Sequence, residues 1–199
     1  MKIIKSFFIL LFCFSASTVS AQDLLVYKSQ NLPRLDSTWV FTPKRVETGK
    51  RLPLIFLLHG YSGNYKQWHS IMDAQSYADK YGFIIVTPDG LYNSWYINSP
   101  RQKNSQFEDF FMKELYTDVV KKYNVDTENI FITGLSMGGH GALSIFLNNI
   151  DKFKSAGSTS GAVDLSTLGT KYGIDQLFDN PEPTLLKQFS VAGNIHKLK

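Results

Sequence analysis

The stretch Gly134-Leu135-Ser136-Met137-Gly138-Gly139-His140-Gly141 lies between an apolar run, 130–133, and a second apolar run, 142–147. This order predicts a strand, a sharp turn with a serine at its apex, and a helix. A glycine on each side leaves room for a turn that crowds the backbone before and after the serine. Ser136 is therefore the candidate nucleophile of the chain, and an ordinary turn serine is the alternative.

The first 21 residues have the pattern of a secretory signal peptide. Lys2 and Lys5 form a basic start, residues 6–16 an apolar core, and Val19-Ser20-Ala21 a small-residue cleavage site. The apolar core is shorter than the roughly 20 residues that a membrane-spanning helix needs. We expect a mature protein that begins at Gln22, is secreted or periplasmic, and has no membrane span.

Composition excludes several classes of protein. Cys13 is the only cysteine and lies in the predicted signal, so disulfides, zinc–thiolate sites and a cysteine nucleophile are excluded from the mature chain. The 21 basic and 17 acidic residues give a formal net charge of +4, and the basic residues are scattered. No run of Lys or Arg marks a nucleic-acid partner.

Apolar segments alternate with helical patterns along residues 22–199, which we expect to form one domain. Short strands are predicted at 24–29 and 39–43, as an antiparallel edge, and further strands at 54–58, 83–86, 130–133 and 155–159. Helices are predicted at 70–80 and 105–123, each opened by a capping box, Ser70 with Asp73 and Ser105 with Glu108. This alternation predicts an α/β fold, a mainly parallel sheet with helices on both faces.

A nucleophilic serine that attacks a carbonyl needs N–H groups aimed at the developing negative charge. The N–H of Met137, directly after the nucleophile, is one candidate. The sequence His59-Gly60-Tyr61 follows the central strand 54–58, and the N–H of Tyr61 is the second. A plain strand-ending turn is the alternative interpretation of His59-Gly60.

The segment 91–104 is longer than a usual connection, which favours a role in shaping a site. It contains Tyr92, Trp95 and Tyr96, whose rings are candidate stacking surfaces for a sugar or an aryl acyl group. Packed loop anchors are the alternative.

Three stretches together resemble a known family: Leu57-Leu58-His59-Gly60, Gly134-Leu135-Ser136-Met137-Gly138-Gly139 and Ser160-Gly161. They are similar to the esterase D/antigen 85 group of α/β-hydrolases, which includes S-formylglutathione hydrolases, feruloyl and acetyl-xylan esterases, and mycolyltransferases. The resemblance runs from about Trp39 to Asp164. It implies an α/β-hydrolase fold, no metal or other cofactor, and ester cleavage by a Ser-Asp-His triad.

The C-terminal part departs from this family. In the family, the catalytic acid and histidine follow two further strands, but no strand pattern appears here after Thr159. The tail 175–199 is polar and carries two prolines. We therefore expect the C-terminal strands, the catalytic acid and the catalytic histidine to be missing, and a chain that ends at Lys199 to be nearly inactive.

The four histidines give no convincing general base. Their expected places are the loop after 54–58, a helix start, the helix beneath the nucleophile, and the tail: His59, His69, His140 and His196. Only the last follows both Ser136 and the candidate acids Asp164, Asp175 and Asp179, and residues so near a chain end are poorly held.

These features predict a serine carboxylic ester hydrolase that acts through an acyl-enzyme on Ser136. Its substrates would be small-molecule esters or acyl groups on carbohydrates. An acyltransferase of the same fold differs only in what attacks the acyl-enzyme. A non-catalytic carbohydrate-binding or structural relative without a complete triad is the alternative from another class.

Overall fold

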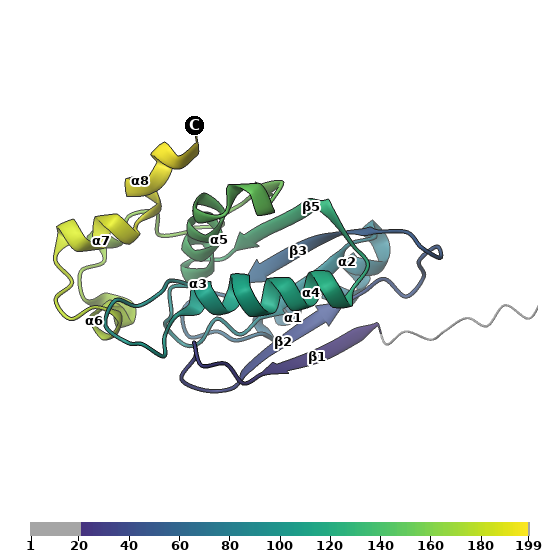
Figure 1. Ribbon diagram of the computed structural model, residues 1–199, viewed down its shortest axis with the longest axis horizontal. Helices are drawn as coiled ribbons and strands as arrows, with labels where there is room; N and C mark the ends of the chain where they lie inside the picture. The colour runs from purple at the N-terminus through teal and green to yellow at the C-terminus, as the bar shows by residue number, and fades with distance from the viewer. Residues whose placement is uncertain (1–20, 199) are drawn as a thin grey trace, which may run out of the picture.

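A six-stranded mixed sheet organises residues 21–198, which are the residues that the computed structural model describes (Figure 1). Its spatial order is β1-β2-β4-β3-β5-β6. The strands are β1 (Gln22–Tyr27), β2 (Asp36–Phe41), β3 (Leu52–Leu58), β4 (Ile84–Pro88), β5 (Val125–Gly134) and β6 (Ser155–Ala156). The predicted signal peptide falls outside the described residues, except for Ala21.

Strand direction divides the sheet into two parts. β1 pairs antiparallel with β2, and β2 pairs antiparallel with β4. β4, β3, β5 and β6 then run parallel, so their carboxyl ends meet at one edge of the sheet. The predicted fold class, a mainly parallel sheet with an antiparallel N-terminal edge, is confirmed.

Helices cover both faces of the sheet, as the continuous apolar run of β3 predicts. Leu54, Phe56 and Leu58 belong to a large core under α3 (Phe107–Phe110), η1 (Phe111–Tyr116), α4 (Thr117–Lys122) and α5 (Met137–Asn148). Leu57, whose side chain alternates to the other face, belongs to a smaller core under α2 (Ala74–Tyr81). Figure 1 shows α3 and α4 in front of the sheet, with α1 (Gln67–Ile71) and α2 behind it.

The predicted helix 70–80 is two helices, and its predicted capping box is wrong. α1 ends at Ile71, and α2 begins after Asp73. The Asp73 side chain accepts a 3.1 Å hydrogen bond from the Ser76 backbone N–H, which makes it the N-cap of α2. An aspartate satisfies a free first-turn donor in this position as well as serine does.

The long helix predicted at 105–123 begins at Phe107, and Ser105 does not cap it. Glu108 accepts hydrogen bonds from Asn148 and Asn149 at the end of α5 instead of closing a capping box. Its middle, η1, is a π-helix, a wider turn that often occurs near functional sites.

β5 is longer than the predicted strand 130–133, because it starts at Val125. Its pairing with β3 shifts register between Leu52 and Leu54. Such an irregularity lets the polar residues 126–129 join the strand without burying their side chains together.

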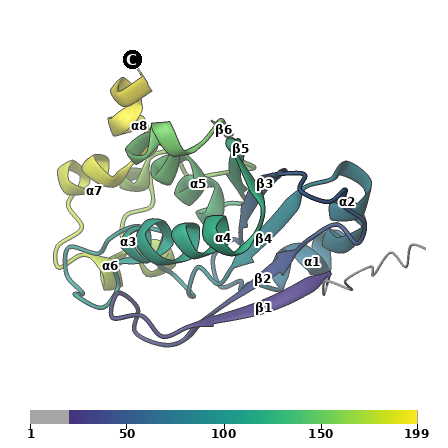
Figure 2. The same cartoon turned by 45° about the vertical axis from the view of Figure 1, so that its right-hand side comes forward.

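Short helices make up the chain after β6, with no further strand among the residues described. They are η2 (Ile150–Lys152), η3 (Leu165–Thr167), η4 (Lys171–Gly173), α6 (Ile174–Leu177), α7 (Pro183–Phe189), α8 (Val191–Asn194) and η5 (Ile195–Leu198). Although this tail is polar in sequence, Ile174, Phe178 and Leu186 are fully buried in the large core. Figure 2 shows β6 at the edge of the sheet, beside β5.

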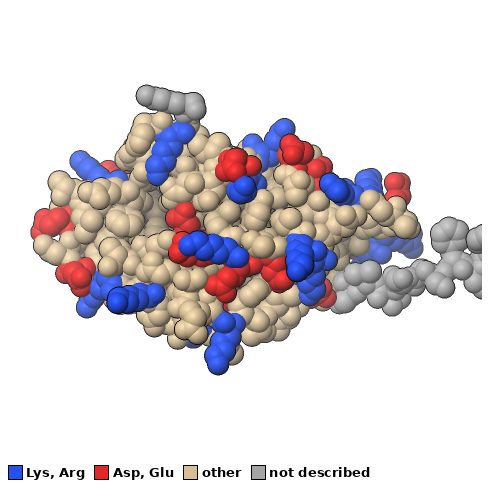
Figure 3. Space-filling model, in the orientation of Figure 1, with Lys and Arg blue, Asp and Glu red and all other residues tan. Residues whose placement is uncertain are grey.

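Charged side chains are interspersed on the face seen in Figure 3, with acidic groups beside basic ones. Among residues 21–198, no helix has both the length and the apolar character that a membrane crossing requires.

Candidate active site

Strained backbone gathers at the carboxyl edge of the parallel strands. Of the seven described non-glycine residues with positive φ, six lie in the segments that follow β3, β4, β5 and β6. The seven are Ser62, Leu91, Trp95, Tyr96, Ser136, Ser160 and Tyr172. Residues in this region of φ/ψ space cost free energy and concentrate at functional sites. Ligands of open α/β sheets bind at this same edge.

Ser136 stands at the tight turn between β5 and α5, as predicted. Its backbone has φ 53° and ψ −112°. A Cβ on Gly134 would lie 2.2 Å from the Gly138 carbonyl oxygen, and one on Gly138 would lie 2.2 Å from the Leu58 carbonyl oxygen. Both glycines are therefore required for the turn to form against the end of β3.

The hydroxyl of Ser136 is available for reaction. The residue is exposed, and among residues 21–198 its side chain has no hydrogen-bond partner. Its backbone is held: the Ser136 N–H donates to the Thr159 carbonyl at 2.8 Å, and its carbonyl accepts from His140 at 3.0 Å. The side chain also stands at the N-terminus of α5, where the helix dipole favours negative charge.

The loop after β3 lies against this turn. A Cβ on Gly60 would be 3.7 Å from the Cβ of Ser136, and one on Gly138 would be 2.5 Å from the His59 carbonyl oxygen. The Leu135 N–H donates to the Leu58 carbonyl at 3.1 Å. The two segments that the sequence singled out are thus neighbours in space.

Two backbone N–H groups beside Ser136 have no acceptor among the described residues. In the loop, Gly60 donates to Gln67 Oε1, Ser62 to the Tyr92 carbonyl and Gly63 to the Gly60 carbonyl, which leaves Tyr61 without one. In the turn, the N–H of Met137 has no acceptor, because it belongs to the first turn of α5.

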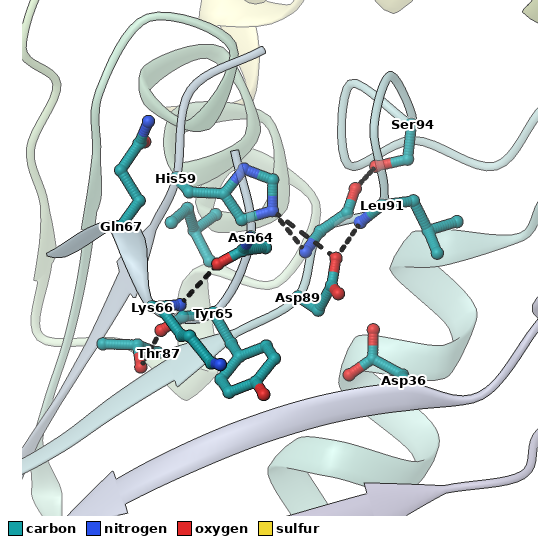
Figure 4. Close-up of polar contacts among 12 residues, drawn as sticks. Asp36, His59, Asn64, Tyr65, Lys66, Gln67, Thr87, Asp89, Leu91 and Ser94 are labelled. Carbon is teal, nitrogen blue, oxygen red and sulfur yellow. Dashed lines mark hydrogen bonds and ion pairs between the residues drawn. The ribbon is translucent and has the colours of Figure 1, made fainter. Parts of the chain in front are cut away.

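His59 fixes the loop to the end of β4. The ring is buried, its Nε2 accepts a 2.7 Å hydrogen bond from the Gly90 N–H, and its Nδ1 lies 2.7 Å from the Gly60 carbonyl oxygen (Figure 4). Because Nε2 is an acceptor, the proton is on Nδ1, which donates to Gly60. The ring therefore faces away from catalysis and shapes the loop.

Asp89 supports the same junction and was not singled out in the sequence. Its carboxylate accepts from the Leu91 N–H at 3.0 Å and from Arg34 Nη2 at 3.2 Å. Ser94 closes the loop through a hydrogen bond to the Gly90 carbonyl. The turn signal Pro88-Asp89-Gly90 after a predicted strand was the feature that could have indicated this role.

Trp95 and Tyr96, the predicted substrate contacts, are in the interior with exposed fractions of 2% and 0%. The Tyr96 hydroxyl donates to the His59 carbonyl, and Trp95 Nε1 donates to the Tyr172 carbonyl. Their burial fits loop anchors, the alternative that the sequence left open. Tyr92 is instead 57% exposed.

The remaining histidines lie away from the Ser136 hydroxyl. His140 is fully buried beneath the turn, as predicted, with Nδ1 3.1 Å from the Trp95 carbonyl oxygen and Nε2 3.0 Å from that of Phe189. Burial lowers its pKa, and the two carbonyl contacts oppose that shift. His69 is exposed at its surface position, and its ring stacks on Phe41.

His196 and the candidate acids are held elsewhere. Lys197, next to His196, donates to Asn148 Oδ1 at the far end of α5, and twelve residues of helix put that end about 18 Å from Ser136. Asp164 caps η3, and Asp179 pairs with Arg101. Within the described part of the chain, no histidine contacts Ser136 and no group of three His, Cys, Asp or Glu side chains could hold a metal ion.

A mainly parallel sheet with a strained serine between a central strand and its helix defines the α/β-hydrolase class. The chain belongs to the family described as "Putative esterase", which it matches over residues 29–195.

Named relatives agree with this family. An S-formylglutathione hydrolase of Arabidopsis thaliana is 29% identical over 136 residues, covering 58% of this chain and 48% of the relative. An acetyl esterase of Caldicellulosiruptor saccharolyticus is 35% identical over 96 residues, covering 47% of this chain and 35% of the relative. The chain thus spans about half, or less, of the length of the curated relatives it matches.

The fold likeness extends further than the sequence likeness. The solved structure of an S-formylglutathione hydrolase from Agrobacterium tumefaciens superimposes with a TM-score of 0.75 at 18% identity. The match covers 87% of this chain and 70% of that one.

Proposed function

We propose that the protein is a carboxylic ester hydrolase with Ser136 as its nucleophile and the N–H groups of Tyr61 and Met137 as its oxyanion hole. One observation carries the proposal. Two N–H groups without an acceptor, one from each of two adjoining segments, flank an exposed, strained serine whose hydroxyl has no partner among the described residues. Loss of one such donor typically costs about 2.7–4 kcal/mol of transition-state stabilisation.

The chemistry follows from this arrangement. The Ser136 oxygen attacks the ester carbonyl carbon, and the carbonyl oxygen takes up negative charge between the two N–H groups. Collapse of this intermediate expels the alcohol and leaves an acyl group on Ser136. Water then attacks the acyl-enzyme and releases the acid. Each attack gives up a proton to a general base, and the family resemblance implies a histidine in that role.

The names of the relatives support esters of small acyl groups as the substrate class. One relative is named for a formyl thioester and another for acetyl esters. Export through the predicted signal 1–21 would place this activity outside the cytoplasm, and N-terminal sequencing of the mature protein tests that location.

Covalent labelling tests the nucleophile directly. We expect a fluorophosphonate probe to form an adduct on the peptide that contains Ser136, and Ser136→Ala to abolish it. Ser160→Ala is the matched control, because Ser160 is also exposed and also has a φ of 53°. Equal labelling of Ser136→Ala, or no labelling of the folded chain, would overturn the proposal.

The general base can be tested on the same chain. Because no described histidine contacts Ser136 and its hydroxyl is exposed, added imidazole can accept the proton in place of a side chain. We expect the labelling rate to rise with imidazole concentration for the wild type and for Ser160→Ala. A rate independent of imidazole would mean that a base already serves Ser136.

A further inference from the structure

Three tyrosines from separate segments meet beside the oxyanion loop. The ring of Tyr61 lies 5.0 Å from that of Tyr92 and 5.5 Å from that of Tyr172, measured between centroids. The interplanar angles are 68° and 75°, so both contacts are edge-to-face. We name Tyr61, Tyr92 and Tyr172 the tyrosine cluster.

The tyrosine cluster is on the surface. Tyr92 is 57% exposed and Tyr172 is 53% exposed, and Tyr61 is partly exposed. Aromatic side chains that pack a loop are buried, as the neighbouring Trp95 and Tyr96 are. A contiguous aromatic surface at a candidate site marks an interaction site more often than isolated exposed rings do.

Tyr172 is presented by a strained backbone. Its φ is 54° and its ψ 35°, inside η4. Its carbonyl accepts a 3.0 Å hydrogen bond from Trp95 Nε1. The next residue, Gly173, has a φ of +75°, and a Cβ there would lie 2.3 Å from Asn93 Nδ2. Surrounding contacts therefore hold a conformation that costs free energy, which is typical of ligand clamps.

The tyrosine cluster is coupled to the candidate active site through the chain itself. Tyr61 carries one of the two unpaired N–H groups and follows Gly60, whose Cβ position is 3.7 Å from the Ser136 Cβ. The carbonyl of Tyr92 accepts a 2.9 Å hydrogen bond from the Ser62 N–H. A group that extends from an ester carbonyl at Ser136 can therefore reach these rings.

We propose that the tyrosine cluster is a subsite that selects esters carrying a planar aromatic ring. The inference rests on the proposed function for its physiological meaning, since it names the substrate class of the same site. An aryl ring gains edge-to-face and offset contacts with tyrosine rings that a saturated ring of equal size does not gain. Desolvation and the neighbouring Tyr92 raise the pKa of Tyr61, which keeps its phenol neutral at physiological pH.

Binding to the Ser136→Ala chain tests the subsite without any dependence on catalysis. The probes are cinnamamide and 3-cyclohexylpropionamide, which match in size but differ in the aromatic ring, and affinity is measured by ligand-observed NMR titration. We expect cinnamamide to bind more tightly. Tyr92→Ala and Tyr172→Ala should each weaken its binding about 2- to 13-fold. Tyr92→Phe should retain the affinity.

Tyr77→Ala is the matched control, because Tyr77 is 47% exposed and its ring lies 5.8 Å from that of Tyr81 on the other face of the sheet. It should leave both affinities unchanged, and thermal unfolding verifies that each variant is folded. Equal affinity for the two probes would overturn the subsite, as would no loss in Tyr92→Ala and Tyr172→Ala. Tighter binding of methyl glucoside than of cinnamamide would also overturn it, in favour of a sugar platform.

The two proposals fail separately. Selective binding of cinnamamide with no fluorophosphonate labelling of Ser136 would retain the subsite and overturn the hydrolase. Labelling of Ser136 without selective binding would do the reverse.

Discussion

The hydroxyl of Tyr96 donates a 3.0 Å hydrogen bond to the carbonyl oxygen of His59. The ring is fully buried, and a Cβ on Gly90 or Gly141 would come within 2.3 or 2.5 Å of it. Tyr96 therefore ties the segment after β4 and the helix of the nucleophile to the loop that carries the Tyr61 N–H. It positions the candidate oxyanion hole from below.

We predict that Tyr96→Phe slows fluorophosphonate labelling of Ser136, because the loop loses the contact that fixes its first residue. The change leaves a buried carbonyl without its partner, which costs about 1–3 kcal/mol. Tyr116→Phe is the control, since it removes a tyrosine bond to the Lys152 carbonyl far from the loop. If both variants label at the wild-type rate, Tyr96 does not position the loop.

Gly138→Ala should prevent the turn at Ser136 from forming against β3. The new Cβ would lie 2.2 Å from the Leu58 carbonyl oxygen and 2.5 Å from that of His59, and both are backbone atoms that cannot move aside cheaply. We expect a loss of stability larger than the roughly 1–3 kcal/mol of ordinary overpacking, measured by urea unfolding. Gly49→Ala, at φ +80° but with nothing within 4 Å, should cost only about 1 kcal/mol. Comparable losses would contradict this account.

Asp36 should make the protein less stable as pH rises. The side chain is fully buried at the start of β2, and its Oδ2 has no partner among the described residues (Figure 4). Burial, and then the charge of Asp89, raise the pKa of Asp36 well above its usual range. The folded state thus binds a proton that the unfolded state releases, and this stabilisation is lost as pH rises above the ordinary value of about 3.9.

Asp36→Asn should remove that dependence. We expect the variant to exceed the wild type in free energy of unfolding at pH 8, on the order of 1–3 kcal/mol, and the two curves to converge near pH 4. Glu128→Gln, at an exposed position, should follow the wild-type curve. Parallel pH curves for the wild type and Asp36→Asn would show that Asp36 is not the group responsible.

His196→Ala should leave labelling of Ser136 unchanged. Its neighbour Lys197 is anchored at Asn148, about 18 Å along α5 from the nucleophile. The measurement is the labelling rate at pH 7.5 with and without imidazole. A loss in His196→Ala that imidazole restores would make His196 the general base and correct the position assigned to it.

The parts that local sequence predicts well are those in which neighbouring residues decide the outcome. The turn at Ser136 follows from glycines at 134 and 138, and the buried strand β3 from an uninterrupted apolar run. Helix boundaries were harder, because capping depends on which donor is free. Asp73 caps α2, whereas Glu108 is drawn to Asn148 and Asn149 on α5, forty residues along the chain.

The sequence by itself determined the α/β class, the strand-turn-helix around Ser136 and the two N–H groups beside it, because periodicity and glycine placement act over a few residues. Only the tertiary structure decided which aromatic rings of the loop face solvent. It buried Trp95 and Tyr96 under hydrogen bonds to Tyr172 and His59, and it brought Tyr172 to Tyr61 across more than a hundred residues. Such contacts depend on how separate segments pack, and no local pattern encodes them.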